Sequence, residues 1–215
     1  MGLSAVVIRI PRSAMILAAA MHPESTKPAE DALERFRQGE LEALEVILPR
    51  YQLRLYRFLL RMVQEPAVAE DLFQQTWVRV IEKISSYDAH RHFDSWLFAI
   101  ARNLAIDHLR RKRGVSLDDH DDGGDAPVDH LAVSGPDPLQ EVLASERGTI
   151  LAAALVELPA IHREVLALRF EEEMKLEQIA EVAGIPLSTV KSRLHRGLEG
   201  LRKRVAAQVS LRGRK

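Results

Sequence analysis

Cysteine is absent from this chain of 215 residues. Its absence excludes disulfide bonds, zinc sites with thiolate ligands, cysteine nucleophiles and thiol-based redox sensing. Aromatic residues are scarce, at 5%, yet 47% of the residues are hydrophobic and 28% are charged. Such a composition is normal for a globular protein, and the length allows one or two domains with hydrophobic cores.

The chain also lacks a large net charge, because 30 Lys and Arg are balanced by 31 Asp and Glu. This sum hides a segregation of charge along the sequence. Residues 101–113 carry a net charge of +4 and residues 191–215 carry +8, whereas residues 114–146 carry −9 without one Lys or Arg. Basic blocks of this kind indicate phosphate binding. The alternative is that each block complements the dipole at the end of a helix.

No uninterrupted apolar run is long enough to span a membrane. The most apolar segment, residues 3–21, contains two arginines and a proline and resembles a signal peptide only superficially, because nothing downstream is typical of a secreted protein. We therefore expect residues 1–28 to be a disordered or non-native extension, with translation starting at Met1, Met15 or Met21.

Helical periodicity dominates the rest of the sequence. Apolar residues recur at three- and four-residue steps over residues 29–62, with breaks expected at Gly39 and Pro49, and another helix is expected over residues 67–84. No alternation typical of strands is long enough to matter. These patterns predict an all-α fold.

A polar loop, residues 85–94, precedes a helix expected from Ser95 to Arg113, with Asp94 as its N-cap. The next stretch is rich in Asp, Gly and Pro and predicts a flexible acidic linker. Helices are expected again from about Pro138. The sequence thus predicts two helical domains and a linker between them: residues 29–113, 139–210 and 114–138 respectively.

Residues 176–201 form the most specific motif in the sequence. Gly184 suits a turn between two amphipathic helices, and Ser188 is expected to cap the second one. This arrangement matches a helix-turn-helix, whose second helix enters the major groove of DNA. The outer face of that helix would read base edges, and its flanks would contact phosphates. The base-reading candidates are Thr189, Ser192 and Arg196, and the phosphate candidates include Lys191 and Arg193. An αα-hairpin with a solvated basic face is the alternative.

The preceding helix, residues 158–170, is amphipathic and is expected to pack beneath the motif through its apolar face. Arg163 and Arg169 could contact phosphates from there, but we expect both to be solvated.

The helix of residues 95–113 is apolar almost all round, which predicts that it is sandwiched between other elements. Its polar stripe comprises Asn103, Asp107 and Arg110. Asn103 beside a basic cluster could read an unstacked base, and aromatic residues of the preceding loop could stack on it. Alternatively, Asn103 and Asp107 form hydrogen bonds within the bundle, and Arg110 pairs with Asp107.

Two patterns now resemble one family. The first is Phe93-x-x-Trp96-Leu97-x-x-Ile100-Ala101-Arg102-Asn103-x-x-x-Asp107-x-x-Arg110, which is similar to region 2 of the sigma-70 family, extracytoplasmic-function (ECF) subfamily. The second is EQIAEVAGIPLSTVKSRLHRGLEGLR, residues 177–202, which with the preceding helix resembles region 4. The resemblance covers residues 29–113 and 139–205 and implies a bacterial transcription initiation factor rather than an enzyme.

The resemblance implies roles for particular residues. It assigns contacts with core RNA polymerase to Asp71, Gln74, Gln75 and Arg79. It assigns binding of the −10 element to Tyr87, His92, Phe93, Asn103, Arg110, Arg111, Lys112 and Arg113. It assigns binding of the −35 element to Ser188, Thr189, Lys191, Ser192, Arg193 and Arg196.

The chain departs from the family pattern at two places. Glu171, Glu172 and Glu173 lie where the family usually has a Gly-containing loop, and Ser188 lies where Gly is frequent. The acidic triple is either a solvated loop or an altered partner contact. The acidic linker is either a plain spacer or a mimic of RNA phosphates in a polymerase channel.

The resemblance predicts a cytoplasmic protein whose partners are core RNA polymerase, promoter DNA and an anti-sigma factor, which could hold it at the membrane. We expect no cofactor, no metal site, no small-molecule substrate and no direct membrane insertion. Histidines in the expected loops lack the spacing of metal ligands. The alternative function is a stand-alone helix-turn-helix regulator that binds duplex DNA by itself.

Overall fold

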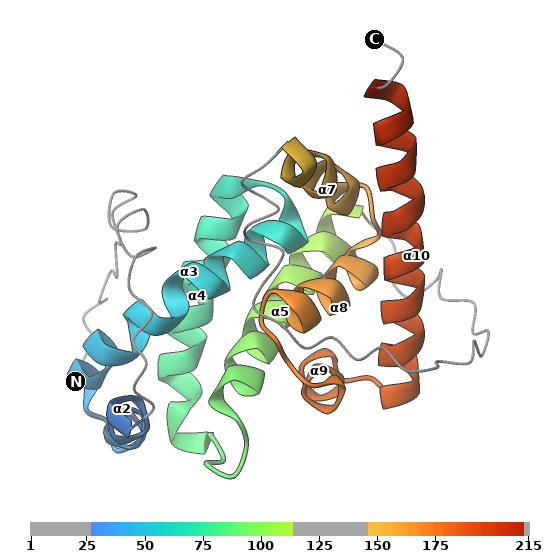
Figure 1. The fold of residues 1–215 in the computed structure, drawn as a ribbon. Helices are drawn as coiled ribbons and strands as arrows, with labels where there is room; N and C mark the ends of the chain where they lie inside the picture. The colour runs from blue at the N-terminus through green and yellow to red at the C-terminus, as the bar shows by residue number, and fades with distance from the viewer. Residues whose placement is uncertain (1–26, 114–145, 213–215) are drawn as a thin grey trace.

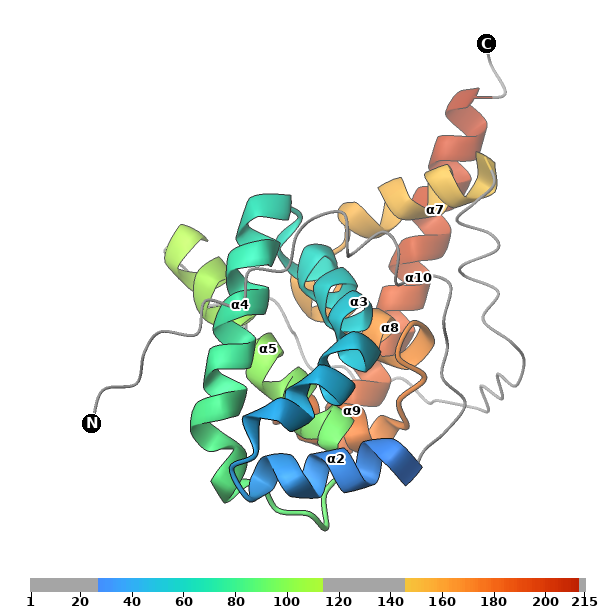
Figure 2. The same ribbon diagram turned by 90° about the vertical axis from the view of Figure 1, so that its left-hand side faces the viewer.

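The computed structural model describes residues 27–113 and 146–212 (Figures 1 and 2). The expected N-terminal extension and acidic linker therefore lie almost wholly outside the described residues. The hypothesis that the linker mimics RNA concerns the same undescribed residues. Every regular element of the described part is a helix, which confirms the all-α prediction. None of these helices is both long enough and apolar enough to cross a membrane.

Residues 27–113, the described part of the N-terminal half, form four α-helices and two short 3₁₀ turns: α2 (Lys27–Arg37), η2 (Leu41–Ala43), α3 (Leu44–Val63), α4 (Pro66–Lys83), η3 (Ile84–Ser86) and α5 (Phe93–Arg113). The C-terminal half consists of α7 (Glu146–Val156), α8 (Ala160–Phe170), α9 (Leu176–Ala183) and α10 (Leu187–Arg212).

Gly39 breaks the first helical stretch as expected, because it has a φ of +96°, a conformation that costs other residues more. The break expected at Pro49 is wrong, since Pro49 lies inside α3. Ile47 and Tyr51 are buried on either side of it, and this burial offsets the backbone hydrogen bond that proline cannot donate. The helix ends instead at Gln64, which has a φ of 63° and donates its backbone N–H to the Leu60 carbonyl at 2.9 Å.

Two predicted caps are also wrong. The helix α5 begins at Phe93, so Asp94 lies in its first turn, and α10 begins at Leu187, so Ser188 lies in the first turn of that helix. Asp94 accepts hydrogen bonds from the Tyr51 hydroxyl at 2.5 Å and from Arg54 Nη2 at 2.9 Å. Its carboxylate therefore joins α5 to α3 instead of capping its own helix.

Buried aromatic and aliphatic side chains fill the N-terminal half. Phe58 and Phe98 meet edge to face, with ring centroids 5.3 Å apart, and Trp77 is 1% exposed. The helix α5 packs against α4, α3 and α9, which confirms that it is sandwiched. Leu97, Ala101 and Ala105 are fully buried on it.

The two halves pack directly on each other. In Figure 1 the helices α8 and α9 lie against the N-terminal half, where α8 contacts α3 and α9 contacts α5. Buried apolar residues of both halves belong to one contiguous core. The boundaries predicted from the sequence therefore separate two helical groups that share a common interior.

Because the two halves share one core, we expect chemical denaturation of the chain to show a single transition. Phe58→Ala in α3 should lower the free energy of unfolding by about 3–5 kcal/mol, and Leu168→Ala in α8 should lower it by about 2–5 kcal/mol. Urea titration followed by circular dichroism measures this. Val46→Ala changes an exposed residue and should shift the value by less than about 0.5 kcal/mol. Two transitions that each respond to one variant only would contradict a shared core.

Candidate nucleic-acid interface

The helix-turn-helix expected near residue 184 is present. The helix α9 ends at Gly184, which has a φ of +66° and donates its backbone N–H to the Ala180 carbonyl. Ile185 donates to the same carbonyl at 3.2 Å, and α10 begins two residues later. Glycine is favoured at this left-handed position because a side chain there is strained. The turn thus sets the angle at which α10 leaves α9.

The second helix of the motif has the two faces that its sequence predicts. Val190 and Leu194 are buried, and the Gly197 position lies so close to α8 that an added Cβ would be 3.3 Å from Leu166. On the outer face Ser188 and Lys191 are exposed. The three base-reading candidates, Thr189, Ser192 and Arg196, are half-buried.

Arg193 is placed differently from the other basic candidates of α10. Only 4% of its surface is exposed. A guanidinium that contacts a DNA phosphate needs an exposed position. Arg193 could therefore contact a phosphate only after a change of conformation that exposes its side chain. Lys191 is already exposed.

The polar stripe of α5 is on the surface. Asn103 and Asp107 are exposed, and the Asn103 side-chain oxygen accepts a hydrogen bond from Arg102 Nη1 at 3.3 Å. Towards the end of the helix, Arg111 Nε donates to the Asp107 carbonyl at 3.2 Å, and Lys112 pairs with Glu65. Arg110 is exposed beside them, and the side chain of Arg113 lies outside the described part. The helix thus ends in an accessible basic cluster.

The aromatic candidates of the loop before α5 are buried rather than open. Tyr87 is 4% exposed and Phe93 is 7% exposed, with ring centroids 5.6 Å apart. Trp96 lies 5.0 Å from the Tyr87 ring and is half-buried. His92 is exposed. Stacking of a base on Tyr87 or Phe93 would thus require this loop to open. Trp96, which belongs to the region 2 pattern but was not among the −10 candidates, is already half-buried at the surface.

The residues expected to contact polymerase lie on α4. Asp71, Gln75 and Arg79 are exposed at four-residue steps and share one side of the helix, and Gln74 is half-buried. Val78, which is 51% exposed, adds an apolar group beside Gln74 and Gln75 that the sequence did not single out. A solvent-facing valine amid polar residues is a feature that burial reveals and composition does not.

Ion pairs join the two halves. Arg102 of α5 pairs with Glu164 of α8 at 2.9 Å, and the Glu164 side chain is fully buried. From the loop after α8, Glu172 pairs with Arg54 and Glu171 pairs with Arg61, each at 2.8 Å. Two residues of the acidic triple that departs from the family pattern, Glu171 and Glu172, therefore form contacts within the chain.

The expectation that Arg163 is solvated is wrong. Its guanidinium is buried and donates to the carbonyls of Val156, Leu158 and Met62 at 2.7, 2.9 and 3.1 Å. Met62 belongs to α3, so Arg163 bridges the two halves. One guanidinium can bind several carbonyls because it carries five N–H donors.

Burial raises the pKa of Glu172 from 4.5 to about 7, although Arg54 acts in the opposite direction. Glu171 and Asp94 raise the pKa further through repulsion between carboxylates. Only 3% of the Glu172 side chain is exposed, so water screens these charges little.

A helix-turn-helix with Lys191 exposed on its second helix, together with the basic end of α5, is typical of an all-helical DNA-binding protein. Comparison with known families agrees: Sigma-70 region 2 matches residues 48–115, and Sigma-70, region 4 matches residues 154–203. The chain belongs to the sigma-70 family, and its similarity to curated ECF sigma factors places it in the ECF subfamily.

Two curated relatives span nearly the same length. The ECF RNA polymerase sigma factor SigW of Bacillus subtilis is 31% identical over 176 residues, which cover 80% of this chain and 94% of SigW. The RNA polymerase sigma factor CarQ of Myxococcus xanthus is 36% identical over 170 residues, which cover 79% of this chain and 93% of CarQ.

Solved structures are similar as well. The sigma factor RpoE of Bartonella quintana, solved in complex with the anti-sigma factor NepR, is 28% identical with a TM-score of 0.54, and the match covers 77% of this chain and 95% of RpoE. CnrH, solved with the cytosolic domain of CnrY, has a TM-score of 0.58 at 20% identity, covers 86% of this chain and 98% of its own, and supports the fold alone.

The raised pKa of Glu172 predicts a particular dependence of stability on pH. The folded chain binds an extra proton between the ordinary pKa of 4.5 and the folded pKa of about 7. The stability that this group contributes is thus fully present below pH 4.5 and is lost as the pH rises through about 7. The free energy of unfolding of the wild type minus that of Glu172→Gln should therefore fall over this range. Glu173→Gln alters an exposed neighbour and should show the same pH dependence of stability as the wild type. If the difference between the wild type and Glu172→Gln does not change with pH, the raised pKa of Glu172 is refuted.

Proposed function

We propose that the chain binds core RNA polymerase, directs it to specific promoters through their −35 and −10 elements and promotes promoter melting. The observation that carries this proposal is the presence of both motifs in one chain: the outer face of α10 after the Gly184 turn and the exposed stripe of α5. A stand-alone regulator would need the first motif only. The family to which the chain belongs consists of transcription initiation factors, not enzymes.

The −35 element is proposed to be read by the outer face of α10. Arg196 can form two hydrogen bonds with guanine, and Thr189 and Ser192 can bond several base edges. Ser188 and Lys191 would contact phosphates, which fix the position of the helix without reading sequence. Arg193, which is 4% exposed, would do so after a change of conformation.

The −10 element is proposed to bind along α5 and the loop before it. Asn103 would bond a base taken out of the stack, beside His92 and the rings of Tyr87 and Phe93. The end of the helix would attract the strand through charge: Arg110, Arg111, Lys112 and Arg113.

Core polymerase is proposed to bind the exposed side of α4. Asp71, Gln74, Gln75 and Arg79 offer polar contacts there, and Val78 offers an apolar one. A mixed polar and apolar surface of this kind is typical of interfaces between proteins that also exist apart.

An anti-sigma factor is the further partner that we propose, because the similar sigma factor RpoE was solved in complex with the anti-sigma factor NepR. Since the chain has no cysteine, a redox signal would have to be sensed by that partner. We place the chain in the cytoplasm, where it could be held at the membrane by a membrane-anchored anti-sigma factor. The proposed activity needs no cofactor or metal in this chain.

Transcription with purified core polymerase tests the proposal. Promoters are first found by mapping transcript start sites after overexpression of the chain. Core polymerase plus the chain should then open these promoters and transcribe from the mapped sites, and neither component should do so alone. Tight, sequence-specific binding of duplex DNA by the chain alone, without any effect on core polymerase, would support the stand-alone regulator instead.

Two substitutions separate base reading from phosphate contact on α10. Arg196→Ala should weaken binding of the polymerase complex by about 1–3 kcal/mol and relax the preference at one base pair of the −35 element. Lys191→Ala should weaken binding to all sequences alike and lower the salt slope by about 1. Fluorescence anisotropy across a salt series measures both. Glu199→Gln serves as the exposed control on the same helix, and identical effects of both substitutions on sequence preference would refute the division of roles.

A further inference from the structure

We propose that Glu65, at the corner between α3 and α4, competes with the single strand of the −10 element for Lys112 and thereby lowers the affinity of the basic end of α5 for that strand. This inference rests on the proposed function, because it concerns the strand that α5 is proposed to bind. Both residues belong to the N-terminal half, so their contact does not depend on how the two halves pack.

Glu65 occupies the short corner between two helices. The helix α3 ends at Val63, Gln64 has a φ of 63°, and α4 begins at Pro66. Glu65 is the N-cap of α4, a position at which a carboxylate usually accepts hydrogen bonds from the first backbone N–H groups of the helix. The side chain of Glu65 makes no such bond. Its carboxylate can therefore serve another element.

The element that Glu65 contacts is the basic end of α5. In Figure 2 the corner between α3 and α4 and the end of α5 lie at the same end of the molecule. Lys112 Nζ donates a hydrogen bond to Glu65 Oε1 across 47 residues of sequence and forms an ion pair with it. This ammonium lowers the pKa of Glu65 from its ordinary value of 4.5, and His108, one turn earlier on α5, lowers it less. Glu65 therefore carries its negative charge at neutral pH.

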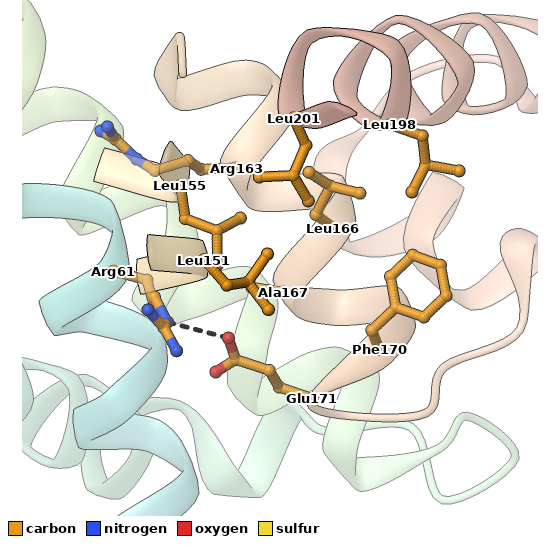
Figure 3. Close-up of a pocket in the computed structure, with 10 residues that line it drawn as sticks. All are labelled: Arg61, Leu151, Leu155, Arg163, Leu166, Ala167, Phe170, Glu171, Leu198 and Leu201. Atoms are coloured by element: carbon orange, nitrogen blue, oxygen red, sulfur yellow. Dashed lines mark hydrogen bonds and ion pairs between the residues drawn. The ribbon is translucent and has the colours of Figure 1, made fainter. Parts of the chain in front are cut away.

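This ion pair differs from those that join the two halves in how far water reaches it. Figure 3 shows Arg61 and Glu171 among the residues that line a mostly apolar pocket of about 210 Å³, and their side chains are 23% and 16% exposed. The side chains of Lys112 and Glu65 are 57% and 48% exposed. An exposed pair of this kind is screened by dissolved salt and contributes little to stability. A phosphate can thus displace Glu65 from Lys112 without disturbing the fold.

The competition concerns the strength of strand binding and not its sequence preference. Lys112 is proposed to contact a phosphate of the strand, and it reaches this phosphate only after it leaves Glu65. The energy of the ion pair is then subtracted from the energy of the phosphate contact. Because phosphates carry no sequence information, strands with a matched and with an altered −10 sequence are weakened equally. Glu65 thus limits binding through charge, and the base contact proposed for Asn103 is unaffected.

Binding of a single strand tests the inference. The complex of the chain with core polymerase is titrated against a fluorescently labelled oligonucleotide that carries the non-template −10 sequence of a mapped promoter, and anisotropy gives the dissociation constant. Glu65→Gln keeps the shape of the side chain and removes its charge. It should tighten binding about two- to fivefold, the range expected for the loss of an exposed ion pair. It should also make the salt slope steeper by up to about 0.7, because one more phosphate is then neutralised.

The variant Lys112→Gln shows whether Glu65 acts through Lys112. In that background Glu65→Gln should leave the dissociation constant unchanged, because the cation for which Glu65 competes is gone. The matched control is Glu45→Gln, which removes an exposed carboxylate near the start of α3, about 30 Å along the helix from the corner. It changes the net charge by the same amount and should leave binding unchanged.

Several outcomes would overturn the inference while the proposed function stands. The first is an unchanged dissociation constant in Glu65→Gln. The second is an equal gain in the Lys112→Gln background, since Glu65 would then act by general repulsion of the strand. The third is an equal gain in Glu45→Gln, and the fourth is a gain confined to the matched −10 sequence. Failure of the wild-type complex to bind the strand or to transcribe from the mapped sites would overturn the proposed function, and this inference with it.

Discussion

The need to cover both sides of α5 governs the whole structure. A helix that is apolar almost all round cannot face water on either side, and here α3 and α4 cover part of it while α9 covers another part. The same helix carries the exposed stripe with Asn103 and ends in the basic cluster. Buried residues and the candidates for −10 recognition thus lie on one element, and the C-terminal half is part of the environment of these candidates.

Charge follows the same division. The near-zero net charge of the chain conceals basic blocks at the ends of α5 and α10, and the ion pairs between the two halves add a second level of compensation. Arginines of the N-terminal half meet glutamates of the C-terminal half, and one of these, Glu172, is buried deeply enough to have a raised pKa. The arginines of these pairs, Arg54, Arg61 and Arg102, are separate from the basic residues proposed to bind phosphates.

Much of the fold could be predicted from the sequence, because helical periodicity is a local signal. The turn at Gly184 and the buried face with Val190 and Leu194 follow from residues within a few positions of one another. Long-range partners could not be predicted. Glu172 lies 118 residues from Arg54, and Arg163 lies 101 residues from the Met62 carbonyl. Asp94 was misjudged as a cap for the same reason, since its partners lie at least 40 residues upstream. The sequence named the candidate residues of the site, which stay a prediction, but the burial of Tyr87, Phe93 and Arg193 depends on neighbours that spacing does not reveal.

The sandwiched position of α5 also bears on what would become of the N-terminal half by itself. Without α9, the apolar side chains that α9 covers on α5 would face water. Exposed apolar surface promotes association with other proteins or with further copies of the same half. The C-terminal half thus acts as a solubilising partner of the N-terminal half within one chain.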